Sequence, residues 1–235
     1  MKKIILFDLY DTIVQDISFH FMDGIKYLYD TFFSKACSWQ EMTAYSATFL
    51  SFYEERKIKY NEICLIKDEI PLFFKKFGVA APDSFAELDY VVMNQMQKVN
   101  LAEDVADTLN TLFEKGIGMY ILSNSIFTGE SAKKMLNGFG ILQYFKKIYS
   151  SADYGIRKPC SKFYQTALDE IFSDNPKLRR TDLLYVGNDY ETDVMGATSM
   201  GLSTVWYNVK HLPNTNHIFI DDIDQFKNIL EIIQR

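Results

Sequence analysis

The first hydrophobic segment of the chain is an apolar run that ends at an acidic residue. Residues Ile4 to Phe7 are all apolar, and Asp8 follows them directly. A continuous apolar run is typical of a parallel strand buried on both faces, because helices cover both sides of such a sheet. Ligands of these sheets bind beyond the carboxyl ends of the strands. Asp8 is therefore a candidate for chemistry, with a turn cap as the alternative role.

Between residues 17 and 95 the apolar residues recur at helical spacing. The first stripe contains Phe21, Ile25, Leu28 and Phe32. Such residues lie on one face of a helix. Ser38 and Glu41 fit a capping box that opens a second helix. The pattern predicts a helical bundle of about four helices whose aromatic residues form mainly its core.

After Leu101 helices and strands alternate. The pattern predicts helices over 103–115, 131–139, 161–171 and 225–235, and strands over 117–122, 147–150, 183–186, 203–207 and 217–220. Alternation of this kind predicts a doubly wound parallel sheet with helices on both faces. We therefore expect an α/β core made of residues 1–16 and 96–235, and a separate helical domain over residues 17–95.

Four of the predicted strands are followed by polar clusters. The first cluster begins at Asp8, and the others are Ser123-Asn124-Ser125, Arg157-Lys158-Pro159 and the stretch from Asn188 to Asp193. Because the carboxyl ends of parallel strands meet at one edge of a sheet, we expect these clusters to converge.

The converging side chains suit displacement through a covalent carboxylate intermediate. An aspartate such as Asp8 is already ionised at pH 7 and can attack without a base. Ser123 with neighbouring backbone N–H groups could hold a phosphoryl oxygen, and Lys158 could neutralise developing charge. Mg²⁺ prefers oxygen ligands and few carboxylates, which suits Asp8 together with Asp189 or Asp193.

Taken together and in this order, the clusters resemble the four motifs of the haloacid dehalogenase-like (HAD) hydrolase superfamily. The resemblance covers essentially the whole chain. The matching stretches are Phe7-Asp8-Leu9-Tyr10-Asp11-Thr12, Leu122-Ser123-Asn124, Arg157-Lys158-Pro159, and Val186-Gly187-Asn188-Asp189 through Asp193. It implies a Rossmann-like core with a helical cap, residues 17–95, that is inserted between the first two motifs and sets substrate choice.

The resemblance also implies roles for individual residues. Asp8 is expected to be the nucleophile and a metal ligand, and Lys158 to hold Asp8 and the substrate. The expected substrate- or phosphate-binding residues are Thr12, Ser123 and Asn124. The expected Mg²⁺ ligands are Asp8, the backbone carbonyl of Tyr10, and oxygens drawn from Asn188, Asp189 and Asp193.

Two positions depart from the family pattern. Phosphatases of the family usually carry a general acid/base aspartate where this chain has Tyr10. A tyrosine with a pKa of ~10 can donate a proton but is a poor base at pH 7. Asp11 could replace the aspartate or could simply cap the turn. Asn188 stands where an aspartate is usual. Whether the motif is counted from Asn188 or from Asp189, it retains two side chains that carry oxygen.

The motifs favour a Mg²⁺-dependent phosphatase that cleaves a small phosphomonoester through an aspartyl-phosphate on Asp8. A 2-haloacid dehalogenase is one alternative, because Tyr10, Ser123-Asn124 and Tyr164 also match those enzymes. Dehalogenases, however, hold the substrate carboxylate with an arginine early in the cap, and the first arginine here is Arg56. A catalytically quiet binding module is the other alternative.

Composition narrows the expected partners. The chain has 235 residues, with 25 Lys and Arg against 31 Asp and Glu, for a net charge of −6. The basic residues are scattered, which argues against a nucleic-acid or anionic-membrane surface. No run approaches the ~18 apolar residues of a membrane span. Three cysteines without a C-x-x-C pair fit reduced thiols. We expect a cytoplasmic protein whose partner is a small-molecule substrate.

Overall fold

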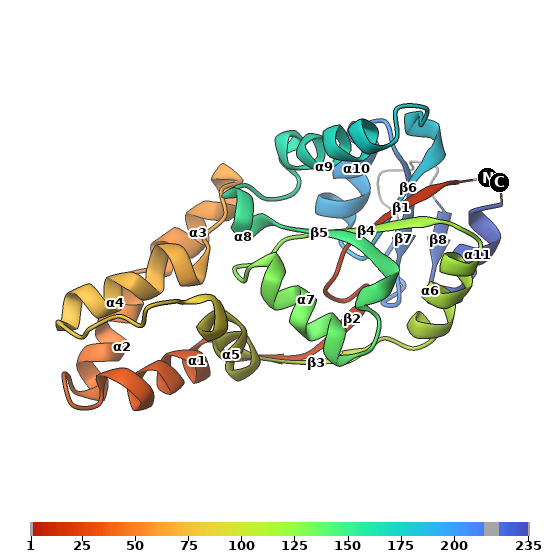
Figure 1. Cartoon of the computed structure of the whole chain (residues 1–235). Helices are drawn as coiled ribbons and strands as arrows, with labels where there is room; N and C mark the ends of the chain where they lie inside the picture. The colour runs from red at the N-terminus through yellow and green to blue at the C-terminus, as the bar shows by residue number, and fades with distance from the viewer. Residues whose placement is uncertain (1, 214–220, 235) are drawn as a thin grey trace.

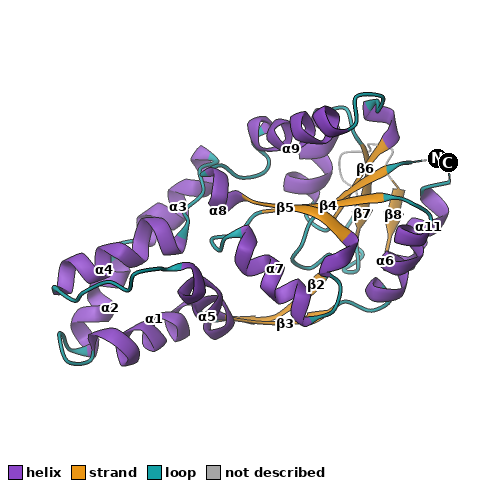
Figure 2. Cartoon of the chain, in the orientation of Figure 1, coloured by secondary structure: helices purple, strands orange, loops and turns teal. Residues whose placement is uncertain are grey.

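A six-stranded parallel sheet forms the centre of the protein (Figures 1 and 2). The computed structural model describes residues 2–213 and 221–234. The strand order is β5-β4-β1-β6-β7-β8. The strands are β1 (Ile4–Phe7), β4 (Gly118–Ser123), β5 (Phe145–Ser150), β6 (Leu183–Gly187), β7 (Ser203–Tyr207) and β8 (Asp221–Ile223). The polar clusters that follow β1, β4 and β6 therefore lie at one edge of three neighbouring strands.

Helices cover both faces of the sheet. In β1, Ile4 and Leu6 pack on the face covered by α9 (Ser161–Asp174) and α10 (Gly196–Ser199). Ile5 and Phe7 pack on the opposite face. The helices on that second face are α6 (Val105–Glu114), α7 (Gly129–Gly138) and α11 (Ile229–Ile232). A strand buried on both sides explains why the first apolar run shows no alternation.

Most elements predicted for the α/β part match the structure to within a few residues. The strand over 203–207 has the predicted bounds. The strand predicted over 217–220 lies outside the described residues, and β8 occupies residues 221–223. The helix predicted over 225–235 is shorter, because a 3₁₀ turn, η6 (Phe226–Asn228), precedes the four residues of α11.

A helical insertion lies between β2 (Val14–Phe19) and β3 (Gln97–Leu101). Its elements are α1 (Phe21–Leu28), η1 (Tyr29–Phe33), α2 (Trp39–Ala47), α3 (Leu50–Lys59), η2 (Leu65–Glu69), α4 (Ile70–Phe77) and α5 (Ala86–Met96). The Ser38 capping box is present, since Ser38 Oγ accepts from Glu41 N and Glu41 Oε2 accepts from Ser38 N. Aromatic rings fill the centre, with Phe33 and Phe74 centroids 4.8 Å apart.

The helical pattern predicted from residue 17 onward is wrong at its start. Residues 17–19 belong to β2, which pairs antiparallel with β3 (Figure 1). The backbone groups of these residues find their partners about 80 residues later in the chain, which local periodicity does not reveal. Phe52 of α3 is 53% exposed, so it is an exception to the expectation that the aromatic residues form mainly the core.

The helical insertion also contacts the α/β part through its own backbone. Glu62 N donates to Gly155 O at 3.0 Å, and Leu65 N donates to Ile126 O at 2.9 Å. Arg157 N donates to Tyr60 O at 3.0 Å. In Figure 1 the end of α3 accordingly lies beside α8 (Ser151–Tyr154).

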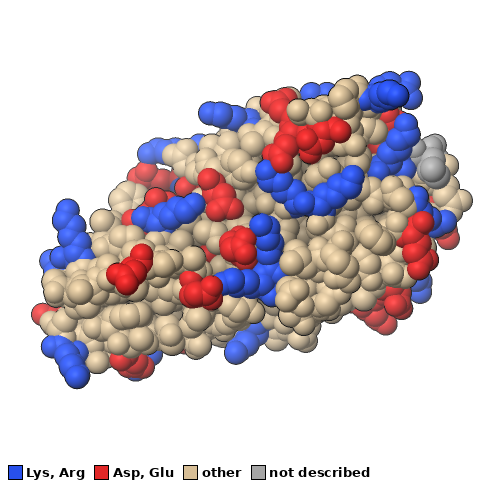
Figure 3. Space-filling model, viewed as in Figure 1, with Lys and Arg blue, Asp and Glu red and all other residues tan. Residues whose placement is uncertain are grey.

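Acidic and basic side chains are intermingled on the face drawn in Figure 3. Within residues 2–213 and 221–234, no helix is long and apolar enough to cross a bilayer.

Candidate active site

A buried cluster of charged groups lies at the carboxyl edge of the sheet. Lys158 Nζ donates to Asp8 Oδ1 and to Asp193 Oδ1, each at 2.6 Å, and to the Tyr185 hydroxyl at 2.9 Å. Asp8, Lys158 and Asp193 are 7%, 2% and 1% exposed. The three motifs that carry these residues therefore meet around one ammonium group.

Burial and charge set the protonation of this cluster. Burial raises the pKa of Asp8 to about 7, against the opposing effect of the Lys158 charge. Burial also disfavours the Lys158 charge, but Asp193 and Asp8 outweigh it and raise the pKa of Lys158 above its ordinary value. Lys158 therefore stays cationic and holds Asp8 in place.

The glycine of the fourth motif, Gly187, makes room for Asp193. A Cβ on Gly187 would lie 2.4 Å from the Asp193 Cγ atom, so a larger residue cannot stand there without displacing the carboxylate. Asp193 Oδ2 accepts from Asp189 N at 3.0 Å. Both oxygens of Asp193 thus have donors, one of them the Lys158 ammonium.

Asn124 fixes the backbone of the lysine loop. Its Oδ1 accepts from Lys158 N at 2.8 Å, and its Nδ2 donates to Lys158 O at 3.1 Å. This pairing supports a positioning role for Asn124, beside the predicted contact with substrate.

Ser123 provides a hydroxyl without a partner. It ends β4, and the pairing of Phe7 with Ile121 places it one residue beyond the level of Asp8. Ser123 is 1% exposed, and its Oγ makes no hydrogen bond. A buried hydroxyl without a partner is costly, so this one is available to a ligand.

Tyr10 faces a cavity of about 210 Å³ beside the cluster, which Asn124 and Arg157 also line. Its hydroxyl accepts from Gln97 Nε2 at 3.2 Å. Burial raises the pKa of Tyr10 to about 12, so the phenol keeps its proton at neutral pH and can donate it.

Asp11 lies on the other side of the same loop. Its φ of 55° is left-handed, and its Oδ1 accepts from Asp16 N at 3.1 Å. It lines a second cavity, of about 520 Å³, together with Asn188 and Asp189, and Asp16 lines both cavities. The Asp11 carboxylate thus caps the turn and is not among the residues that line the Tyr10 cavity.

The four motifs and their convergence decide the family. A model of the haloacid dehalogenase-like hydrolases matches residues 5–207. The chain belongs to this family. HAD-like hydrolases of known structure share the fold across the whole chain, including a 2-haloacid dehalogenase from Pseudomonas syringae pv. Tomato DC3000 with a TM-score of 0.71, 18% identity, and coverage of 100% of this chain and 99% of that one.

Two further relatives are similar in sequence. The chain is 27% identical to the pyrimidine 5'-nucleotidase PynA of Streptococcus pneumoniae over 77% of its own length and 76% of that protein. It is 25% identical to YfnB of Bacillus subtilis over 77% of its own length and 74% of that protein. A crystal structure of YfnB bound to magnesium has a TM-score of 0.61 at 20% identity and covers 100% of this chain and 99% of that one. As a member of this family, the protein is a hydrolase. Several of its relatives are named as nucleotidases or phosphatases.

The oxygen atoms near Asp8 fit a magnesium ion by their chemistry. The Thr12 hydroxyl donates to Asn188 Oδ1 at 3.4 Å and so brings Asn188 beside the loop that follows Asp8. Among the described residues no three His, Cys, Asp or Glu side chains form a metal-binding group. A site built from one or two carboxylates, an amide, a backbone carbonyl and water still meets the preferences of Mg²⁺.

The sequence did not point to several groups of this site. Tyr185 was assigned only to an apolar strand, yet its hydroxyl accepts from Lys158 and donates to Asp193 Oδ1 at 3.1 Å. Arg56 and Glu62 belong to the helical insertion and line the cavity next to Tyr10. Arg157 lines the same cavity, and its place directly before Lys158 in the sequence was a signal for that.

Proposed function

We propose that this HAD-like hydrolase is a Mg²⁺-dependent phosphatase of a small phosphomonoester and acts through an aspartyl-phosphate on Asp8. The observation that carries the proposal is the pairing of Lys158 with Asp8, beside the unpartnered hydroxyl of Ser123. A carboxylate fixed by a cation is a ready nucleophile, and a spare buried hydroxyl can donate to a phosphoryl oxygen. The likeness to the nucleotidase PynA agrees with this chemistry.

In the first step an Asp8 oxygen attacks phosphorus, and the bond from phosphorus to the ester oxygen breaks. Lys158 and Ser123 offset the charge on the phosphoryl oxygens. The Tyr10 hydroxyl gives its proton to the leaving oxygen, because an alkoxide is a stronger base than a phenolate whose pKa is about 12. The product alcohol then leaves.

In the second step water attacks the phosphorus of the aspartyl-phosphate and releases phosphate and the Asp8 carboxylate. The Tyr10 phenolate formed in the first step takes the proton of that water. This cycle removes the difficulty that a neutral tyrosine is a poor base, and it needs no contribution from Asp11.

Asp8, the Tyr10 carbonyl and oxygens of Asn188 and Asp189 would hold the magnesium ion, while Asp193 holds Lys158. When bound, Mg²⁺ supplies positive charge that offsets the charge of the phosphate. We further propose that the helical insertion serves as the cap of the enzyme.

The proposal is tested by phosphate release from a panel of phosphomonoesters, with Mg²⁺ and with EDTA. We expect release only with Mg²⁺, and its loss by at least ~10³-fold in Asp8→Asn, because an amide is not a nucleophile. Tyr10→Phe should lower kcat by about 10²-fold, within the usual range for a general acid. Asp11→Asn is the matched control and should retain most of the activity.

The same panel contains short 2-haloacids. Metal-independent halide release that depends on Asp8, without phosphate release, would overturn the phosphatase proposal in favour of dehalogenation. Phosphate release that survives Asp8→Asn would contradict the aspartyl-phosphate.

A further inference from the structure

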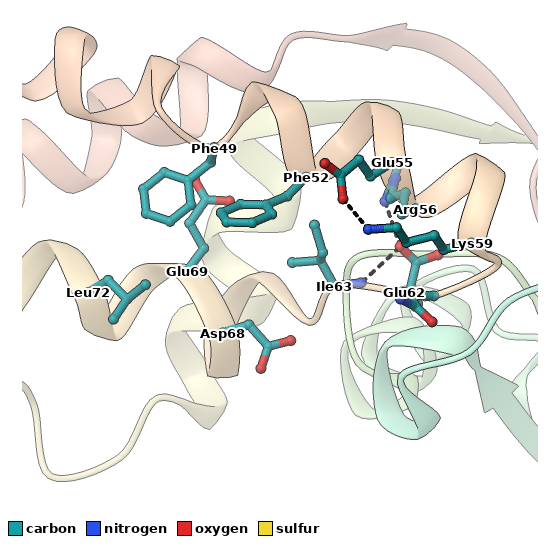
Figure 4. Close-up of a pocket in the computed structure, with 11 residues that line it drawn as sticks. Phe49, Phe52, Glu55, Arg56, Lys59, Glu62, Ile63, Asp68, Glu69 and Leu72 are labelled. Atoms are coloured by element: carbon teal, nitrogen blue, oxygen red, sulfur yellow. Dashed lines mark hydrogen bonds and ion pairs between the residues drawn. The ribbon is translucent and has the colours of Figure 1, made fainter.

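Two arginines enter the cavity beside Tyr10 from different parts of the fold. Arg56 comes from α3 in the helical insertion, and Arg157 comes from the loop that carries Lys158. Their side chains are only 19% and 15% exposed. Figure 4 is a close-up of a neighbouring cavity that Arg56 and Glu62 also line, and it shows Glu62, which follows α3, next to Arg56. Two guanidinium groups thus meet beside the proposed reaction centre.

Glu62 lies between the arginines, and both of its carboxylate oxygens accept hydrogen bonds from nearby donors. Its Oε1 accepts from Arg56 Nη1 at 2.6 Å and from Ile63 N at 3.1 Å. Its Oε2 accepts from the Ser151 hydroxyl at 2.8 Å. Arg157 Nη1 is 3.6 Å from Oε2, an ion pair that is longer than a hydrogen bond. Glu62 therefore holds both arginines without satisfying all their donors.

Arg56 Nε and Arg157 Nη1 are buried and make no hydrogen bond. Leaving a buried donor of a charged group unpaired is costly. Two guanidinium groups that line one cavity and share one carboxylate therefore have donors left for a further acceptor. Burial also lowers the pKa of Arg157, as expected for a cation that is short of partners. A planar guanidinium matches a carboxylate or a phosphate, which can accept two parallel bonds.

We propose that Arg56 and Arg157 together bind a second anionic group, a carboxylate or a phosphate, of the substrate. This inference rests on the proposed phosphatase function and names its substrate class, a compact phosphomonoester with an additional acid group. The cavity of about 210 Å³ is below the ~300–1,000 Å³ of ordinary ligand pockets, which suits a small metabolite.

Among the described lining residues, Asp16 of β2 is the other carboxylate of this cavity besides Glu62. Arg157 directly precedes Lys158, whose ammonium holds Asp8. An anion bound by Arg157 therefore lies close to the loop that reaches Asp8, and we place the phosphoryl group of the same ligand at Asp8.

Binding without turnover tests this inference. Phosphonates have a carbon–phosphorus bond that a phosphatase does not hydrolyse, so 3-phosphonopropionate, propane-1,3-bisphosphonate and propylphosphonate can be compared by calorimetry in the presence of Mg²⁺. We expect the native protein to bind one of the two ligands with a second acid group about tenfold or more tightly than propylphosphonate. Which one it prefers distinguishes a carboxylate from a phosphate.

Variants assign the preference to the arginines. Arg157→Gln and Arg56→Gln should each reduce it to about threefold or less, with little change in the affinity for propylphosphonate. Arg157→Lys keeps a charge beside Glu62 and should lose part of the preference even if the glutamine variants fold poorly. Lys59→Gln, one turn from Arg56 and paired with Glu55 at the surface, is the control and should keep it.

The inference would be overturned if the native protein did not prefer the ligands with a second acid group over propylphosphonate. It would also be overturned if Arg157→Lys and the glutamine variants kept that preference unchanged. The arginines would then only link α3 to the α/β part. Hydrolysis of propyl phosphate without any preference would reject the second-anion site and leave the phosphatase proposal intact. A preference for the ligands with two acid groups, without hydrolysis of any phosphomonoester, would reject the phosphatase proposal and leave the second-anion site intact.

Discussion

At the scale of single residues, the most informative atom is the Ser123 hydroxyl. A buried serine normally uses its hydroxyl in a hydrogen bond, as Ser150 does on the neighbouring strand by donating to Phe127 O at 2.6 Å. Ser123 pairs with Ser150 in register but has no such partner. Its hydroxyl therefore contributes little to stability and is free to contribute to binding.

We expect Ser123→Ala to lower kcat/KM for phosphomonoesters by about tenfold or more, because a hydrogen bond to a charged oxygen is lost. The free energy of unfolding should stay the same or rise by up to about 1 kcal/mol, because a buried hydroxyl without a partner is removed. Ser150→Ala should show the opposite pattern, with a loss of about 1 kcal/mol of stability and smaller kinetic effects. Activity assays and urea unfolding measure both quantities. Equal kinetic effects in the two variants would contradict the assignment.

At the scale of elements, the packing of α3 against η2 leaves one carboxyl group poorly satisfied. Glu69 Oε2 accepts from the Tyr53 hydroxyl of α3 at 2.6 Å, but Glu69 Oε1 is buried without a partner. Burial raises the pKa of Glu69 to about 7, although the Tyr53 hydrogen bond opposes the shift. The folded protein therefore binds this proton more tightly than the unfolded chain does.

The protonated Glu69 side chain contributes to the free energy of unfolding. This contribution is fully present below pH 4.5, the ordinary pKa, and is lost as the pH rises through 7. Glu69→Gln removes this ionisation. We therefore expect the free energy of unfolding of the variant, relative to that of the native protein, to rise by up to about 3 kcal/mol between pH 5 and pH 8. Urea unfolding at both pH values measures the difference. Glu55→Gln on the exposed side of α3 should show no such gain. If the free energy of unfolding changed with pH in the same way in the native protein and both variants, the assignment of the pH dependence to Glu69 would be wrong.

At the scale of the whole molecule, α5 of the helical insertion is joined to α7 through a buried aspartate. Asp89 Oδ2 accepts from the backbone N and the hydroxyl of Thr128, at 3.0 and 2.6 Å, and from the Ser131 hydroxyl at 2.6 Å. Thr128 caps the start of α7. One carboxylate thus supports a helix start and a contact between two parts of the fold.

Asp89→Ala should lower the free energy of unfolding by about 3 kcal/mol, because three donors lose a charged acceptor inside the protein. Glu87→Ala is the matched control. Its carboxylate pairs with Lys134 of α7 across the same contact but is exposed, so its loss should cost at most about 1 kcal/mol. Urea unfolding with a single reporter in each part would show whether both parts are affected. Similar losses of unfolding free energy in the two variants would contradict the proposed role of Asp89 in joining α5 to α7.

The elements of the α/β part could be predicted from the sequence because their patterns are local. The apolar run before Asp8 and the run before Ser123 each identify a buried strand, and a parallel sheet then places their ends at one edge. The residues of the four motifs could be named for the same reason. Residues 17–19 could not be assigned correctly, since the strand that pairs with them lies about 80 residues away.

The family and the order of the polar strand ends could be identified from residues that are neighbours in the chain, and the same residues predict Asp8 as the reactive carboxylate. How these groups share their contacts depends on the tertiary structure. It placed the Lys158 ammonium between Asp8 and Asp193, turned Asp11 away from the Tyr10 cavity, and brought Arg56 to Arg157. These contacts join segments far apart in sequence, and their geometry follows from the packing of the helical insertion and the sheet as a whole.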